Sequence, residues 1–108
     1  FFTPDADPAF IRKVAEDMSL APPEVAIGAM GSVLKLDLAP VVAGIRVPVV
    51  AINADRTPTD EARIQKTLPG FRAVILENTG HFLMMEKPEQ FNPVLLREIE
   101  AMAGNGNG

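Results

Sequence analysis

The chain has no cysteine and a single histidine among its 108 residues. Without cysteine there are no disulfides or thiolate metal sites, and one histidine with scattered carboxylates gives no converging set of metal ligands. Positive charge is also scarce: ten Lys and Arg against fourteen Asp and Glu give a net charge of −4, which does not favour nucleic acid as a partner. Apolar runs such as APVVAGI (39–45) are too short for a membrane span, and the start shows no secretory signal. No metal or other cofactor is therefore expected, and the compartment stays open, with the cytoplasm favoured.

Residues 1–38 have the pattern of two short amphipathic helices. Asp7 suits a helix N-cap and Pro8 suits the first helical position. Pro22 and Pro23 end the first helix and begin the second. The expected apolar faces are Phe10, Ile11, Val14 and Met18 in the first helix, and Val25, Ala26, Ala29, Met30, Val33 and Leu34 in the second. Two such helices suit a lid or a packing layer rather than the centre of a sheet.

The rest of the chain alternates strands and helices. IRVPVVAINAD (45–55) and FRAVILEN (71–78) are apolar runs without polar alternation, which is typical of strands buried on both faces of a parallel sheet. Between them a helix is expected over 57–70, with Thr57 or Thr59 as its cap. The last helix is expected to begin at Pro88 and to bury Phe91, Leu95, Ile99 and Met102.

The predicted order of elements is thus α-α-β-α-β-α, and the two strands should form a right-handed parallel crossover. Two parallel strands cannot cover their own faces and edges, because such sheets need flanking helices and further strands. The pattern therefore predicts an α/β fold, as the C-terminal portion of a doubly wound parallel sheet whose beginning is absent. A chain that opens with Phe1 instead of Met either starts part-way through a longer product or has been trimmed.

Two residues that could take part in catalysis follow the two predicted strands. Asp55 comes directly after the first strand and His81 a few residues after the second. Ligands of open α/β sheets bind beyond the carboxyl ends of the strands, and a carboxylate with an imidazole makes two thirds of a nucleophilic triad. The third member is missing. The only serines, Ser19 and Ser32, lie in the helical N-terminal part, outside any G-x-S-x-G turn.

The strand, acid and histidine segments resemble the C-terminal segment of the α/β-hydrolase superfamily. VPVVAINADRTPTD, followed by LPGFRAVILENTGHFLMMEKPEQFNPVLLREI, is similar to the family pattern over residues 45–102. The most specific part is the G-H-F, the later glutamate, the proline and the phenylalanine, at Gly80, Glu86, Pro88 and Phe91 around the histidine. The resemblance implies that a serine elbow and an oxyanion-hole loop lie on strands upstream of this chain.

By that resemblance His81 takes the place of the catalytic histidine, and Asp55 is the nearest match to the catalytic acid. Asp55 departs from the family pattern, because Ala54 stands where the family usually has glycine and Pro58 follows after three residues instead of four. Asp60 is a weaker substitute. Some members of the superfamily take their acid from an earlier strand, which would leave Asp55 a loop residue.

Each candidate also has a purely structural interpretation. His81 could be a polar loop residue bonded to a nearby carbonyl, and Asp55 a turn residue that caps the following helix. Phe82 and Met84 are candidate substrate contacts, but equally residues that pack at the floor of a pocket. Glu86 is expected to be structural and to satisfy backbone donors near the last helix.

The resemblance divides the chain into lid-like helices (1–38), the C-terminal β-α-β-α part of the hydrolase core (39–103) and a flexible tail (104–108). The expected function is that of the C-terminal part of a serine-type hydrolase acting on a small ester or similar acyl compound, inactive on its own. It would associate with itself or pair with the missing N-terminal part. The alternatives are an inactive self-associating fragment and a non-catalytic module that binds an apolar ligand.

Overall fold

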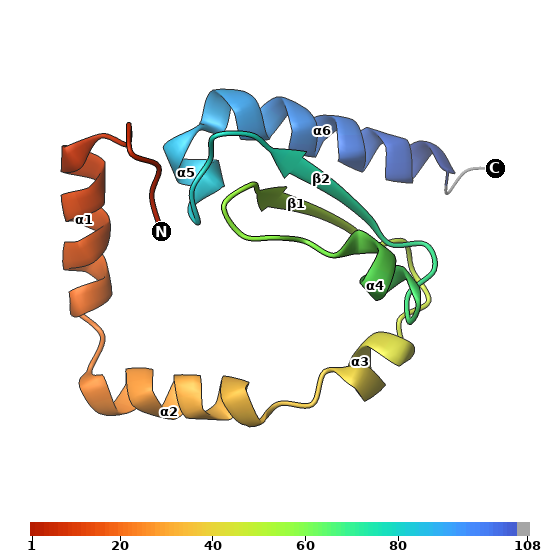
Figure 1. Ribbon diagram of the computed structural model, residues 1–108, viewed down its shortest axis with the longest axis horizontal. Coiled ribbons are helices and arrows are strands. Elements are labelled where there is room, and N and C mark those ends of the chain that lie inside the picture. The colour runs from red at the N-terminus through yellow and green to blue at the C-terminus, as the bar shows by residue number, and fades with distance from the viewer. Residues whose placement is uncertain (106–108) are drawn as a thin grey trace.

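Two parallel strands with helices before, between and after them make up the computed structural model, which describes residues 1–105 (Figure 1). The elements are α1 (Pro8–Ser19), α2 (Pro23–Lys35), α3 (Ala39–Ala43), β1 (Val50–Ala54), α4 (Glu61–Gln65), β2 (Arg72–Leu76), α5 (Leu83–Glu86) and α6 (Pro88–Asn105). None of the helices described is long and apolar enough to cross a membrane.

The predicted parallel pair of strands is confirmed. β1 and β2 run parallel from the pair Val50 and Arg72 to the pair Ala54 and Leu76. The chain is therefore of mixed α/β class with a small parallel sheet. The observed order adds two short helices, α3 and α5, to the predicted elements. α3 forms inside the run 39–45, where Pro40 occupies the first helical turn and suits that position.

The helix starts depend on local capping. Asp7 accepts a hydrogen bond of 2.9 Å from the Ala9 amide, and this confirms the predicted start of α1. The cap predicted for α4 was wrong. Asp60 is the N-cap and accepts a bond of 3.0 Å from the Arg63 amide, while the hydroxyl of Thr59 accepts 2.9 Å from the side chain of Asn53.

The buried apolar residues are few: one lies on α1, and the others lie on β2, on α5 and in the segment between α4 and β2. They are Val14, Leu68, Phe71, Leu76 and Leu83. Every residue of β1 is only half-buried, so the burial on both faces predicted for the strands is not reached within residues 1–105. The buried area is limited because, among residues 1–105, α4 and α6 are the main helices that contact the strands, and α4 has only five residues.

The buried face of α6 also differs from the prediction. Phe91 is half-buried as expected, but Leu95 and Ile99 are exposed. Glu98 is buried instead, and its carboxylate pairs with the guanidinium of Arg72 at 2.5 Å. Arg72 supplies the charged partner that a carboxylate needs when it loses water. α6 continues to Asn105, beyond the expected start of the tail at 104, and the rest of that tail (106–108) lies outside the described residues.

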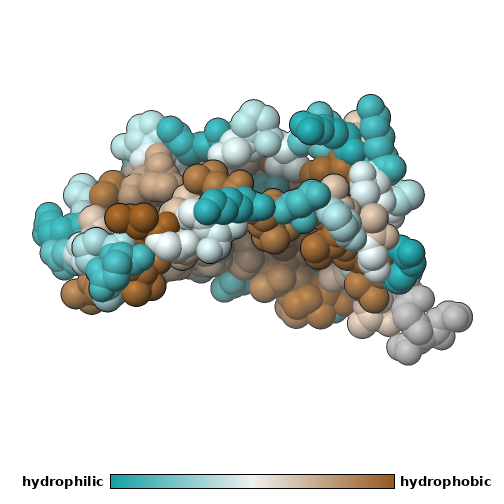
Figure 2. Space-filling model, turned by 90° about the horizontal axis from the view of Figure 1, so that it is seen from below, coloured by the Kyte–Doolittle hydropathy of each residue, from teal (hydrophilic) through white to brown (hydrophobic). Residues whose placement is uncertain are grey.

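The first three helices form an arm that stands away from the sheet (Figure 1). No residue of α2 is buried, although its apolar side chains cover about half of its circumference. The chain has a radius of gyration of 16.8 Å, whereas a compact chain of this length has about 13 Å. Its accessible surface is 8061 Å², whereas a compact monomer of this mass exposes about 5,800 Å². Viewed from the side of the arm, apolar side chains lie across much of the surface (Figure 2).

Candidate functional site

The structure brings Asp55 and His81 to the same end of the sheet. Asp55 directly follows β1 and His81 lies five residues after the end of β2, and both strands point the same way. His81 is exposed and borders two adjoining hollows, of about 250 and 300 Å³, beside the end of β1. The lining residues of the two hollows, besides His81, are Phe1, Asn53, Ala54, Arg56, Thr57, Pro58, Thr59 and Leu83. The imidazole is thus open to a molecule bound beyond the carboxyl ends of the two strands.

The carboxylate of Asp55 binds the backbone of the loop that leads to the histidine. One oxygen accepts a hydrogen bond of 2.8 Å from the Asn78 amide and the other accepts 3.3 Å from the Thr79 amide. The Asn78 hydrogen bond is the main cause that lowers the pKa of Asp55 below its usual value. Within residues 1–105 no hydrogen bond joins this carboxylate to the imidazole of His81. Asp55 therefore fixes the position of the histidine loop, and it does not cap the following helix.

The loop itself is tightly constrained. Asn78 adopts a left-handed backbone conformation (φ 52°), which asparagine tolerates better than most residues. Thr79 is fully buried, and its hydroxyl donates a hydrogen bond of 2.8 Å to the Leu76 carbonyl. At Gly80 a Cβ atom would collide with Glu86 and with the backbone of Phe1. The glycine before the histidine is therefore required by close packing.

Aromatic side chains surround the imidazole. The rings of Phe1 and Phe82 each lie edge-on to the His81 ring, with centroids 4.9 Å away. The His81 amide donates a hydrogen bond of 2.5 Å to the Phe1 carbonyl. Phe2 also lies against Phe82, with ring centroids 5.9 Å apart. These contacts hold the histidine loop against the N-terminal segment, a neighbour that the sequence pattern did not indicate.

Glu86 anchors the same N-terminal segment. One carboxylate oxygen accepts hydrogen bonds from the hydroxyl of Thr3 at 2.5 Å and from the amide of Thr3 at 3.3 Å. Thr3 is buried, and the second Glu86 oxygen is buried without a partner among the described residues. We expected Glu86 to satisfy donors near the last helix. Its donors come from residue 3 instead, because α5 lies against the start of the chain.

The two expected substrate contacts lie in different places. Phe82 is half-buried beside the imidazole, whereas Met84 is 44% exposed on α5 and lines neither hollow. Leu83 and Thr57 line the site and were not predicted. Their only sequence signal is that they follow the two strands: Thr57 lies on the loop after β1, and Leu83 begins α5 after β2.

Neither serine is available beside His81. The hydroxyl of Ser19 donates a hydrogen bond of 2.6 Å to the Glu16 carbonyl, and that of Ser32 donates 3.0 Å to the Gly28 carbonyl. Both lie on the arm and line neither hollow at the histidine. The part of the chain that the structure describes therefore holds no serine nucleophile at this site.

Comparison with known proteins adds no relative: no family model, no curated protein and no solved structure matches this chain. Among residues 1–105 there is also no cluster of three His, Cys, Asp or Glu side chains that could hold a metal ion. The fold and the site therefore define a small α/β protein with a parallel sheet, which has an exposed histidine at the carboxyl ends of its strands.

Proposed function

We propose that this chain is the C-terminal part of a serine-type α/β hydrolase that acts on a small ester or similar acyl compound. One observation carries the proposal: His81 is exposed at a hollow beyond the carboxyl ends of two parallel strands, with Asp55 on the neighbouring loop. Open α/β sheets bind their ligands at this end of their strands.

His81 is the general base and then the general acid in this proposal. Its imidazole takes the proton of an attacking serine hydroxyl while the oxygen bonds to the acyl carbon. It then returns that proton to the departing alcohol, and the same two steps with water release the acid. The serine and the oxyanion-hole donors come from residues outside 1–108, since Ser19 and Ser32 are bonded within their own helices.

Asp55 acts as a positioning residue for His81. Its carboxylate holds the amides of Asn78 and Thr79, two and three residues before the histidine. A nearby carboxylate stabilises the imidazolium that forms during the reaction, because the two charges are opposite. That charge comes from Asp55, or from an acid on an upstream strand.

Hydrolysis of p-nitrophenyl acetate tests the catalytic role. We expect turnover by a longer protein that contains these residues and only background rates for residues 1–108 alone. His81→Ala in the longer protein should lower kcat by about 10³-fold or more. Met85→Ala is the matched control, because Met85 is exposed and lines neither hollow. A retained rate in His81→Ala removes this histidine from the mechanism.

Covalent labelling separates the nucleophile from the base. A fluorophosphonate probe should label a serine outside residues 1–108 in the longer protein. Labelling at Ser19 or Ser32 contradicts the proposed division of the triad.

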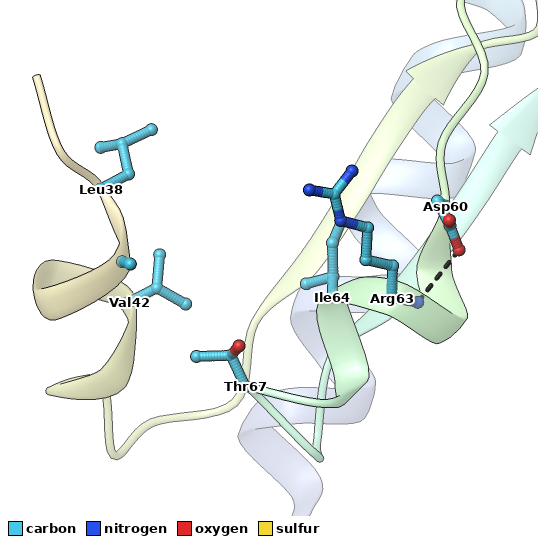
Figure 3. A pocket seen from close by; sticks show the side chains of 7 residues that line it. Leu38, Val42, Asp60, Arg63, Ile64 and Thr67 are labelled. Atoms are coloured by element: carbon cyan, nitrogen blue, oxygen red, sulfur yellow. Dashed lines mark hydrogen bonds between the residues drawn. The ribbon is translucent and has the colours of Figure 1, made fainter. Parts of the chain in front are cut away.

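The groove between α3 and α4 favours a second candidate function, the binding of an apolar ligand without hydrolysis. This groove has a volume of about 490 Å³, within the range of small-molecule pockets. Leu38 and Val42 on one wall face Ile64 and Thr67 on the other, and the Asp60 cap of α4 lies at its end (Figure 3). Titration with octanol, followed by NMR, should change the chemical shifts of Val42 and Ile64 first. Val42→Asp should abolish the effect, whereas Leu34→Asp on the exposed arm should not.

A further inference from the structure

The two edges of the small sheet differ in the hydrogen bonds that their outward backbone groups make. The outer edge of β2 is covered by side chains of α4. Glu61 accepts a hydrogen bond of 2.7 Å from the Ala73 amide, and Gln65 donates 2.9 Å to the Phe71 carbonyl. The same two side chains are bonded to each other at 3.2 Å. Side-chain caps of this kind prevent a further strand from pairing at an edge.

The outer edge of β1 has no such cap. The Val49 carbonyl and the Asp55 amide are bonded to β2, at 3.2 and 3.1 Å. Because backbone groups of a strand point alternately to its two sides, Val50, Ile52 and Ala54 direct their amides and carbonyls away from β2. Across residues 1–105 no hydrogen bond reaches these outward groups. The strand is also uncharged from Val50 to Ala54, so it lacks the charges that protect natural edges.

We propose that this edge of β1 pairs with the same edge of a second copy of the chain, antiparallel and about a two-fold axis through Ile52. Val50 then lies opposite Ala54 of the partner subunit, and Ala51 lies opposite the partner subunit's Asn53. Each cross-strand pair is uncharged, so no like charges meet across the axis. The product is a four-stranded sheet in the order β2, β1, partner β1, partner β2.

This pairing ends at the dimer. Both outer edges of the four-stranded sheet are β2 strands, and on each one the Ala73 amide and the Phe71 carbonyl are already bonded to Glu61 and Gln65. A two-fold interface that leaves only capped edges is closed and does not propagate into a fibre. The second copy is therefore favoured over an open chain of strands.

The exposed surface of the chain fits an interface of this kind. The accessible surface of 8061 Å² exceeds that of a compact monomer by roughly 2,000 Å². A standard protein interface buries about 800 Å² per partner. The inference stands on edge geometry and area, and it does not rest on the proposed hydrolysis.

Light scattering after size-exclusion chromatography tests the proposal on residues 1–108. We expect twice the 11.6 kDa of one chain at tens of micromolar protein. Ile52→Pro removes one outward amide and keeps the bonds to β2, so this variant should elute as a folded monomer with unchanged circular dichroism. Ile75→Pro makes the same change on the outer edge of β2 and should remain a dimer. A wild-type monomer, or a dimer that survives Ile52→Pro, overturns the proposal.

A cysteine variant tests the pairing without a change of backbone. The chain has no cysteine, so Ile52→Cys places a single thiol on the two-fold axis, where opposite Cα atoms of a bonded antiparallel pair lie about 5.5 Å apart. That separation suits a disulfide. Mild oxidation should cross-link Ile52→Cys to a covalent dimer at least tenfold faster than Ile75→Cys. Equal rates for the two variants would show that the edge of β1 is not the interface.

Discussion

The carboxylate of Asp55 accepts a 2.8 Å hydrogen bond from the backbone amide of Asn78. The two residues lie 23 positions apart, and their contact joins the loop after β1 to the loop that carries His81. The predicted acid and the predicted histidine are therefore connected through the backbone in this structure. The hydrogen bonds of Asp55 therefore act on the imidazole through the placement of residues 78–81.

The pH dependence of this contact is the first prediction. The Asn78 amide lowers the pKa of Asp55 in the folded chain. The contact therefore stabilises the folded state at pH values above the unfolded pKa of about 3.9. It is lost as the pH falls through the still lower folded value. NMR titration of the Asp55 carboxyl should give a pKa below 3.8, and the amide shift of Asn78 should follow the same curve. In Asp55→Asn the amide should lose this titration. A pKa at or above the ordinary value contradicts the contact.

The space at Gly80 gives the second prediction. A methyl group there meets the carboxylate of Glu86 and the backbone of Phe1 and Phe2, so Gly80→Ala should destabilise the chain by about 1–3 kcal/mol, as overpacking does. Chemical denaturation measures the loss. Gly70→Ala is the control, because nothing lies within 4 Å of a Cβ atom built there. Equal stability of the two variants would show that the N-terminal segment does not pack on the histidine loop.

The ion pair of Arg72 and Glu98 gives the third prediction. Arg72→Ala leaves the buried Glu98 carboxylate without its cation, which should cost about 1–3 kcal/mol in the free energy of unfolding. The double change Arg72→Ala with Glu98→Leu should recover most of that loss, since an apolar replacement of a buried pair is often neutral. Urea denaturation of the three proteins measures both effects. No recovery in the double variant would contradict this account of why α6 buries residue 98.

The contrast between core and arm gives the fourth prediction. Leu76 is 4% exposed and Leu34 is 81% exposed. Leu76→Ala should destabilise the chain by about 2–5 kcal/mol, the usual cost of a cavity. Leu34→Ala should change stability by no more than about 0.5 kcal/mol. A large cost at Leu34 would mean that the exposed arm is covered in solution.

The sequence was most informative where neighbours in the chain decide the structure. The start of α1 at Pro8 with Asp7 as cap is a local choice of dihedral angle and amide partner, and it was predicted. The parallel pairing of β1 and β2 was also predicted, since two largely apolar runs separated by a helix have few other arrangements. The cap of α4 was missed: Thr57 or Thr59 was expected, whereas the Thr59 hydroxyl accepts from Asn53 and Asp60 accepts from the Arg63 amide.

By itself the sequence determined the two strands, the starts of α1, α2 and α6, and the placement of Asp55 and His81 beyond the strand ends. These follow from hydrophobic runs, prolines and caps, whose effects extend over a few residues. Tertiary structure alone decided that Asp55 binds Asn78, that Thr3 binds Glu86 and that Glu61 covers the edge of β2. These contacts join residues far apart in the chain. Which donor meets which carboxylate depends on how whole elements pack, and no local pattern records it.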